Sequence, residues 1–320
     1  MRGSLVRNEQ MAGRTAAAVL LLAGACASGD GAPAAPQLPP GGTWRALAAM
    51  PAARQEVASA ELGGRIFVIG GYDSRGDSTD SVFVYDPAAN AWSRAAPLPF
   101  SNNHAAAAVA GGRLFAFGGL SSRAFAYDAA HDAWTEVASM HFQHGSTPAV
   151  GVLDGRIYVA GGAGSTMIGN EVESYDPAAD RWTLLPPLRV PRNHCAGQFI
   201  GGRFYVVAGR PGAAAEVALE AFDPQGNTWT ALPSLPTARS GIAAAAVRGR
   251  LYVFGGEGDR IFGEVEVFDP TTGAWRQLAA MPTPRHGIFA AVIGTDVYLA
   301  GGATSPGFAA TAINEVFAVE

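Results

Sequence analysis

One pattern recurs six times along this chain of 320 residues and restricts its fold more than any other feature. The six tryptophans are spaced 42 to 48 residues apart. An aromatic residue followed by Asp precedes five of them. A pair of small residues returns with a similar period, and its copies are Gly70-Gly71, Gly118-Gly119, Gly161-Gly162, Ala208-Gly209, Gly255-Gly256 and Gly301-Gly302. Because six copies agree, we expect the chain to be an array of structural repeats.

Each repeat is expected to contain four β-strands. In the first full copy, apolar segments at 57–62, 65–69 and 82–85 and a strand that opens on Trp92 are separated by turn residues. A four-stranded antiparallel unit of this length cannot bury both faces alone, so the repeats must stack, and radial stacking gives a β-propeller. The 41 glycines, 21 prolines and 15% charged residues suit short strands and tight turns. The sequence therefore predicts an all-β, six-bladed propeller with four antiparallel strands per blade.

The chain begins and ends within a repeat. A lone fourth strand at 44–48 precedes the first full copy, and three strands at 288–293, 297–300 and 315–319 follow the last one. We therefore predict that one N-terminal strand pairs with three C-terminal strands to close the ring, in a propeller that covers residues 43–320.

The Gly-Gly, Tyr-Asp and Trp positions over residues 44–320 together resemble the repeats of the kelch family of β-propellers. The resemblance implies that two sets of loops share one face around a central channel. These are the loops that precede each blade's first strand and the loops that follow each glycine pair. Loops tolerate variation and carry binding residues, so a function is expected at this channel mouth.

Arginine recurs at one position of the repeat. Sixteen residues before each pair of small residues the copies hold Arg54, Asn102, Gly145, Arg192, Arg239 and Arg285. One interpretation is that this arginine ties neighbouring blades together through backbone or carboxylate groups, and the other is a positive ring for an anionic ligand. We favour the first because a repeated residue usually serves the repeat.

The residues that directly follow this position form a polar rim. They are Gln55-Glu56, Asn103-His104, Ser146-Thr147, Asn193-His194, Ser240-Gly241 and His286-Gly287. The resemblance implies that these residues lie near the ligand in kelch domains that bind peptides. Kelch domains that bind acidic peptides tend to carry Arg here, so an acidic peptide is not expected. We select as ligand-binding residues Glu56, Asn103, His104, Asn193, His194, Arg239, His286 and Arg260, with the loops at 72–80 and 257–264.

No cofactor or metal is expected at this rim. His104 and His194 fall in the second and fourth repeats, and residues on alternate blades are expected to stand too far apart across a channel to share an ion. The copper oxidases of this family need a Cys crosslinked to Tyr, and Cys195 has no evident partner for that.

The resemblance leaves an enzyme as the alternative function. Bacterial sialic-acid mutarotases are exported kelch propellers and need an acid/base pair at the mouth, which the carboxylates and Arg260 of the loop at 257–264 offer. No nucleophile elbow, phosphate loop or metalloprotease motif is present. We favour a non-enzymatic binding module and keep a sugar mutarotase or epimerase as the alternative.

The N-terminal segment resembles an export signal. Residues 11–28 combine a basic start, an apolar run too short to span a bilayer, and small residues, and Met11 is a plausible start. Residues 22–26 resemble a bacterial lipobox, with Ala23 where Leu is usual, which would make Cys26 the lipidated first residue. Cleavage by an ordinary signal peptidase is the alternative. We predict a signal peptide at 1–26, a flexible linker at 27–42, and a periplasmic or outer-surface lipoprotein or else a secreted protein.

The charge balance limits the partners. A net charge of -5 does not provide the clustered basic face that nucleic acid requires. We expect a monomer whose partner is a protein, a peptide or a small polar or sugar ligand, with membrane contact through a lipid anchor alone.

Overall fold

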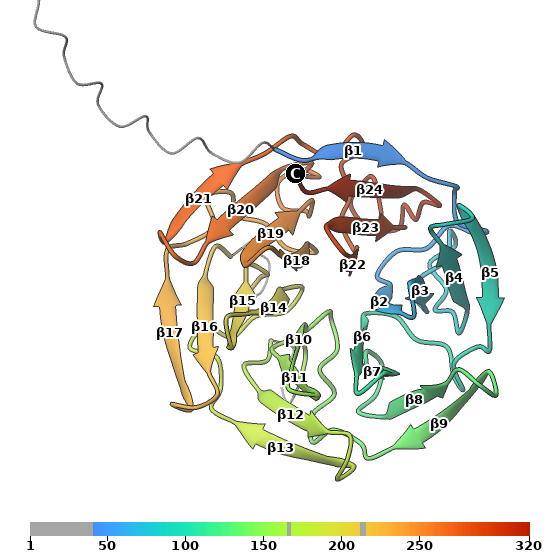
Figure 1. Cartoon of the computed structure of the whole chain (residues 1–320), viewed down its shortest axis with the longest axis horizontal. Helices are drawn as coiled ribbons and strands as arrows, with labels where there is room; N and C mark the ends of the chain where they lie inside the picture. The colour runs from blue at the N-terminus through green and yellow to red at the C-terminus, as the bar shows by residue number, and fades with distance from the viewer. Residues whose placement is uncertain (1–40, 165–167, 212–215) are drawn as a thin grey trace, which may run out of the picture. The chain divides into compact units, whose positions relative to one another are not determined.

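The computed structural model describes residues 41–164, 168–211 and 216–320. In these ranges, 24 strands form six four-stranded sheets, which are arranged as blades around a central channel (Figure 1). The six-bladed, all-β prediction with four antiparallel strands per blade is confirmed. The signal peptide and Cys26 lie outside the described residues, as does nearly all of the predicted linker. Within the described ranges, no helix is long and apolar enough to cross a membrane.

The strands follow one another from the channel outward in each blade. Blades 1 to 3 contain β2 (Ala58–Leu62), β3 (Arg65–Ile69), β4 (Val82–Asp86), β5 (Ala91–Ala95); β6 (Ala105–Ala110), β7 (Arg113–Gly118), β8 (Ala124–Asp128), β9 (Ala133–Val137); and β10 (Ala149–Leu153), β11 (Arg156–Ala160), β12 (Val172–Asp176), β13 (Arg181–Leu185). Blades 4 and 5 contain β14 (Ala196–Ile200), β15 (Arg203–Val207), β16 (Leu219–Asp223), β17 (Thr228–Leu232); and β18 (Ala243–Val247), β19 (Arg250–Phe254), β20 (Val265–Asp269), β21 (Ala274–Gln277). Blade 6 contains β22 (Ala290–Ile293), β23 (Asp296–Ala300), β24 (Asn314–Ala318) and β1 (Thr43–Ala46).

The ring closes as predicted, by one N-terminal and three C-terminal strands. The strand β1 pairs antiparallel with β24, in the register Thr43 to Ala318 (Figure 1). The ring of Trp44 lies 5.0 Å from that of Phe317 in β24 and 6.0 Å from that of Phe254 in the neighbouring blade. The N-terminal strand therefore completes one sheet and also contacts the next.

Each tryptophan joins its blade to the preceding one. The six indole N–H groups donate to backbone carbonyls just beyond the outermost strand of the preceding blade, at 2.8 to 3.2 Å. The aromatic residue of the aromatic-Asp pair packs against the same tryptophan, as Tyr85 does on Trp92 with ring centroids 5.0 Å apart. Contacts between and within blades thus account for the most regular signal in the sequence.

The glycine pairs let two loops approach each other at the channel mouth. At Gly71, which has a φ of 88°, a Cβ atom would lie 2.5 Å from the carbonyl oxygen of Gln55. No side chain fits there, so the loop after the inner hairpin can lie directly against the loop that precedes it.

The recurrent arginines stabilise the blades from inside. Arg192, Arg239 and Arg285 are 0% exposed and pair with Glu220, Glu266 and Glu315, the second residues of β16, β20 and β24. Arg239 also donates to the carbonyls of Thr237 and Gly255, which fixes the connecting segment to the blade that it enters. The interpretation as a positive ring for a ligand is wrong for these three arginines, because their guanidinium groups are inaccessible and paired.

Candidate functional site

A ring of backbone hydrogen bonds narrows the channel mouth. One residue per blade, just ahead of the inner strand, has a left-handed backbone with φ between 50° and 63°: Glu56, His104, Thr147, His194, Gly241 and Gly287. Their N–H groups donate from blade to blade, five to the carbonyl of the preceding ring residue and that of His194 to Ser146, at 2.8 to 3.4 Å. A left-handed backbone costs about 1 kcal/mol or more at each non-glycine residue, so the closed ring must hold it in place. The side chains of this ring converge near the axis.

Glu56 reaches across the ring to side chains from three other blades. Its Oε2 lies 3.4 Å from His104 Nε2 and accepts a hydrogen bond from Thr147 Oγ1 at 3.2 Å, and its Oε1 lies 3.7 Å from His286 Nδ1. Gly287 leaves the space for this carboxylate, because a Cβ there would lie 2.5 Å from Oε1. Burial alone would raise the pKa of Glu56, but the nearby histidines outweigh it and hold the pKa well below its usual range. The buried carboxylate is therefore ionised.

His104 and His194 face each other edge to face, with ring centroids 5.1 Å apart. Each is oriented by the asparagine before it: Asn193 Oδ1 lies 2.9 Å from His194 Nδ1, and Asn103 Oδ1 contacts His104 Nδ1 in the same way. Because an amide oxygen accepts, each Nδ1 carries a proton, and each Nε2 faces away from its asparagine.

The Nε2 atom of His194 accepts a hydrogen bond from Arg210 Nη2 at 3.0 Å. Burial lowers the pKa of His194 to about 3, against the opposing charge of Glu56 and with help from His104 and Arg210. This imidazole is therefore neutral at physiological pH.

His286 lies between two carboxylates. Its Nε2 donates to the carbonyl of Ser305 at 3.2 Å, and its Nδ1 is 3.5 Å from Glu257 Oε2 and 3.7 Å from Glu56 Oε1. Burial would lower the pKa of His286, but these carboxylates raise it above its usual value. Within the described residues, this Nδ1 has no hydrogen-bond partner although His286 is only 3% exposed.

These groups line a pocket of about 310 Å³ at the mouth. Its outer wall includes Tyr72 and Phe308, whose rings meet edge to face at 5.1 Å, and Phe308 is 63% exposed. Arg210 and Glu257 form an ion pair of 3.0 Å across the pocket. The site thus combines buried ionisable groups with an aromatic edge.

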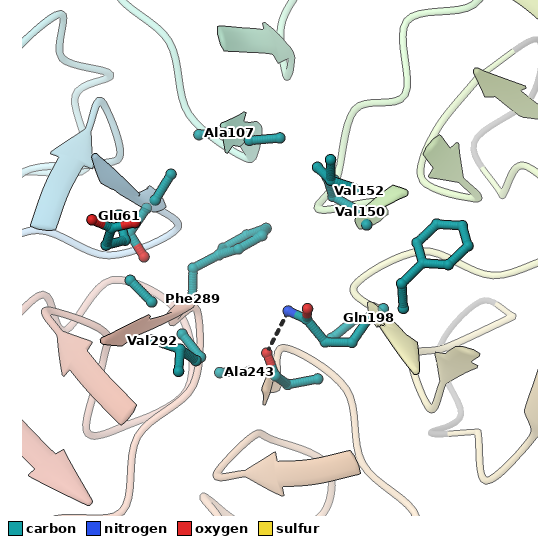
Figure 2. A pocket seen from close by; sticks show the side chains of 18 of the residues that line it. Glu61, Ala107, Val150, Val152, Gln198, Ala243, Phe289 and Val292 are labelled. Atoms are coloured by element: carbon teal, nitrogen blue, oxygen red, sulfur yellow. Dashed lines mark hydrogen bonds between the residues drawn. The ribbon is translucent and has the colours of Figure 1, made fainter. Parts of the chain in front are cut away.

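A second pocket, of about 240 Å³, lies between the inner strands of the channel (Figure 2). Small and apolar residues such as Ala107, Val150 and Val292 form much of its wall, and Gln198 donates to the carbonyl of Ala244 at 3.0 Å. Glu61 is the ionisable residue among those that line it, so the chemistry concentrates at the mouth.

Family models match two parts of the chain. The Kelch motif matches residues 53–99, and the KLHDC2/KLHL20/DRC7 Kelch-repeats domain matches residues 155–302. The chain belongs to the kelch-repeat β-propeller family. Kelch-like protein 35 of Mus musculus is 27% identical over 150 residues, which are 46% of this chain and 26% of that protein. Kelch-like protein 25 of Xenopus laevis is 35% identical over 81 residues, 22% of this chain and 13% of that protein. The matched part of this kelch chain thus spans about a quarter or less of the length of these relatives.

A solved structure shows the same fold. The structure of YjhT superposes on this kelch propeller with a TM-score of 0.74 and 15% sequence identity, and the match covers 84% of this chain and 95% of that one. At this identity, the similarity shows the fold alone.

The kelch propeller brings together most of the residues selected from the sequence. Glu56, His104, His194 and His286 line the pocket, and Asn103 and Asn193 orient two of the histidines. Two selected residues lie elsewhere.

Arg239 is buried inside blade 5 in its ion pair with Glu266, so its expected position on the rim is wrong. Arg260 does not line the mouth pocket. It pairs with Glu264, and its guanidinium group lies 4.2 Å from the centroid of the Phe262 ring. Of its loop, Glu257 alone lines this pocket.

The expected separation of His104 and His194 is also wrong. The ring of backbone hydrogen bonds is so narrow that side chains from alternate blades meet over the axis. Distance therefore does not exclude an ion shared by these two histidines.

Sequence reasoning missed Arg210 as a site residue and did not single out Tyr72 and Glu257 within their loops. All three directly follow a pair of small residues. This position forms a β-bridge to the rim, as in the bridges from Tyr72 to Gln55 and from Arg210 to Asn193. The residue after each pair therefore carries a signal for the site that the repeat pattern could have revealed.

Proposed function

We propose that this kelch propeller is a non-enzymatic binding protein that takes a small, hydroxyl-rich ligand, such as a monosaccharide, in the pocket at the channel mouth. The observation that supports this most is the convergence of Glu56, His104, His194 and His286 from four different blades on one buried point. Buried ionisable groups that share a cleft are characteristic of binding and catalytic sites.

The size and chemistry of the pocket support a small sugar. A volume of about 310 Å³ is at the lower end of the range for small-molecule sites, so a folded partner would meet the rim alone. Glu56 and Glu257 accept hydrogen bonds from hydroxyl groups and Arg210 donates them, while Tyr72 and Phe308 offer an apolar edge. Two carboxylates disfavour an anionic ligand, which favours a neutral sugar over a sugar acid.

A sugar mutarotase or epimerase is supported less well by the same site. General acid and base groups work best when their pKa is near the working pH. Glu56 and His194 both have a pKa far below 7, and Glu264 of the loop at 257–264 is tied to Arg260. His286, with its raised pKa, is the group that would suit proton transfer.

We expect calorimetric titration of the full chain with glucose, galactose and mannose to show that at least one of these sugars binds. The expected stoichiometry is one sugar molecule per chain, with a Kd of about 1 mM or tighter. Glucuronate and N-acetylneuraminate should bind more weakly. His104→Asn and His194→Asn should weaken binding about tenfold or more, because each removes an imidazole that faces the ligand. Asn tolerates the left-handed backbone of these positions, so the ring should be preserved.

The matched control is His131→Asn, since His131 is exposed in a turn far from the pocket residues in sequence and should leave the affinity unchanged. Failure of every neutral sugar to bind, or equal affinity in both pocket variants, would contradict the proposal. Anomer-exchange NMR on a sugar that binds separates the two functions: an exchange rate that the protein does not raise supports binding alone.

We also propose that the propeller is exported, on the basis of the signal-like residues 11–28. Lipidation at Cys26 would anchor it in the cell envelope, and cleavage by an ordinary signal peptidase would release it. Intact mass spectrometry of the mature protein distinguishes a lipidated Cys26 from an unmodified N-terminus.

A further inference from the structure

We infer that Glu56, His104 and His194 form a binding site for one divalent transition-metal ion of the Zn²⁺ type at the base of the pocket. One carboxylate oxygen and one imidazole nitrogen from each histidine all lie within 4.8 Å of one another. This inference goes beyond the proposed sugar binding, since the ion would bind whether or not a sugar is present.

The spacing of these atoms already approaches that of a metal site. Bonds of about 2.0 to 2.1 Å to a tetrahedral ion place neighbouring ligand atoms about 3.3 to 3.4 Å apart. Glu56 Oε2 and His104 Nε2 are separated by 3.4 Å. The ring of His194 must shift toward this pair to bind the same ion, because its centroid lies 5.1 Å from that of His104.

Both histidines are oriented by a hydrogen bond from the ring nitrogen that would not bind the ion, as metal-binding histidines usually are. A ligating imidazole typically donates its other ring N–H to an oxygen acceptor, which fixes the ring and directs the free nitrogen at the ion. Asn103 and Asn193 serve as these acceptors for His104 and His194. The backbone ring holds both histidines and Glu56 in place, so little ordering is required when an ion binds.

A further nitrogen faces the same space. Among the described residues, His286 Nδ1 is buried without a hydrogen-bond partner, and it lies 3.7 Å from the carboxylate of Glu56. Its side chain is 3% exposed, so solvent does not compensate it. In the neutral ring, whose Nε2 donates to the carbonyl of Ser305, this Nδ1 carries a lone pair that can face a cation held by Glu56.

The ligand set selects the class of ion. Two imidazoles and one carboxylate suit Zn²⁺, Co²⁺ and Fe²⁺, whereas Mg²⁺ and Ca²⁺ prefer sites made of oxygen atoms. Three protein ligands also leave coordination positions open, as in metal sites that bind a further molecule. All three residues line the pocket, so such a molecule could reach the ion.

Arg210 competes with the ion and supplies a distinctive test. Its Nη2 donates to His194 Nε2 at 3.0 Å, and an ion can bind this nitrogen once Arg210 turns away. Arg210 is 30% exposed and already pairs with Glu257, so it has a partner when it moves. Removing its positive charge should therefore strengthen metal binding, which a merely structural cluster would not show.

The experiment is a Zn²⁺ titration of the full chain after EDTA treatment and removal of the chelator, in competition with a chromophoric chelator and without sugar. We expect one Zn²⁺ per chain that millimolar Mg²⁺ does not displace. His104→Asn and His194→Asn should weaken binding about a hundredfold or more, and Arg210→Gln should strengthen it several-fold. His131→Asn, which alters an exposed histidine, should leave the affinity unchanged.

No stoichiometric Zn²⁺ binding, or equal affinity in both pocket-histidine variants, would overturn the metal site. If those variants fail to fold by circular dichroism, Co²⁺ absorption of the unmodified protein decides. Intense visible bands of a four- or five-coordinate ion support the site, and the weak bands of octahedral Co²⁺ overturn it. Sugar titration in the presence of EDTA is a separate readout, so failure of the metal site and failure of the proposed function are distinguishable.

Discussion

Deletion of residues 44–49 is expected to lower the melting temperature of the chain by about 10 °C or more. The deletion removes three of the four residues of β1 with their pairing to β24, and the packing of Trp44 on Phe317. Loss of a packed tryptophan alone costs roughly 3–5 kcal/mol, and about 1 kcal/mol shifts the melting temperature of a domain of this size by roughly 2 °C or more. The strand β24 would also become an exposed edge.

Thermal unfolding followed by circular dichroism tests this closure. Arg45→Ala is the matched control, because Arg45 lies exposed on the same strand and its loss leaves the backbone pairing intact. We expect this variant to unfold within about 1 °C of the unmodified chain. A deletion variant with an unchanged transition would show that the ring does not depend on its N-terminal strand.

Replacement of Arg239 by Met is expected to destabilise the propeller by about 3–5 kcal/mol. The substitution leaves Glu266 buried without its cation, and burying an unpaired charge is the costly part of breaking such a pair. The double variant Arg239→Met with Glu266→Met should lose less than the sum of the two single variants, because neither charge remains. Urea unfolding of the three variants provides the free energies.

An exposed ion pair is the control for this cycle. Arg123 pairs with Glu136 at 2.8 Å on the surface, and Arg123→Met should leave the urea midpoint nearly unchanged. If Arg239→Met is as mild as Arg123→Met, the buried arginine does not support the blade as described.

The repeat predicted the architecture because the residues that define it act between neighbouring blades. Each tryptophan contacts the preceding blade, so six tryptophans imply six blades, and the lone first strand needed three partners. Contacts between neighbouring blades can be predicted because the residues that form them recur in every repeat. The signal-like residues and the export that they suggest stay predictions.

The site was less accessible to sequence reasoning because it depends on the width of the channel. His104 and His194 belong to alternate blades, the second and the fourth, and their contact follows from the ring of backbone hydrogen bonds. No pattern of residue types specifies that width. Their identity as rim residues was predictable, and their convergence was not.

Arg239 was assigned to the rim because its partner was overlooked. Glu266 stands in the third strand of the same blade, and the equivalent residue is also Glu in the blades of Arg192 and Arg285. In blade 1 that residue is Phe83, and Arg54 instead stacks 5.3 Å over its ring. Comparing the two positions across the repeats would have identified the arginine as structural.

Histidine-ring NMR of the full chain, titrated with the neutral sugar that binds most tightly, tests the central claim most directly. The chain has six histidines, so the ring signals are few and each His→Asn variant assigns one of them. We predict that saturating sugar shifts the ring signals of His104, His194 and His286 and leaves that of His131 in place. Unchanged signals from all three pocket histidines at saturation would contradict a ligand site at the channel mouth.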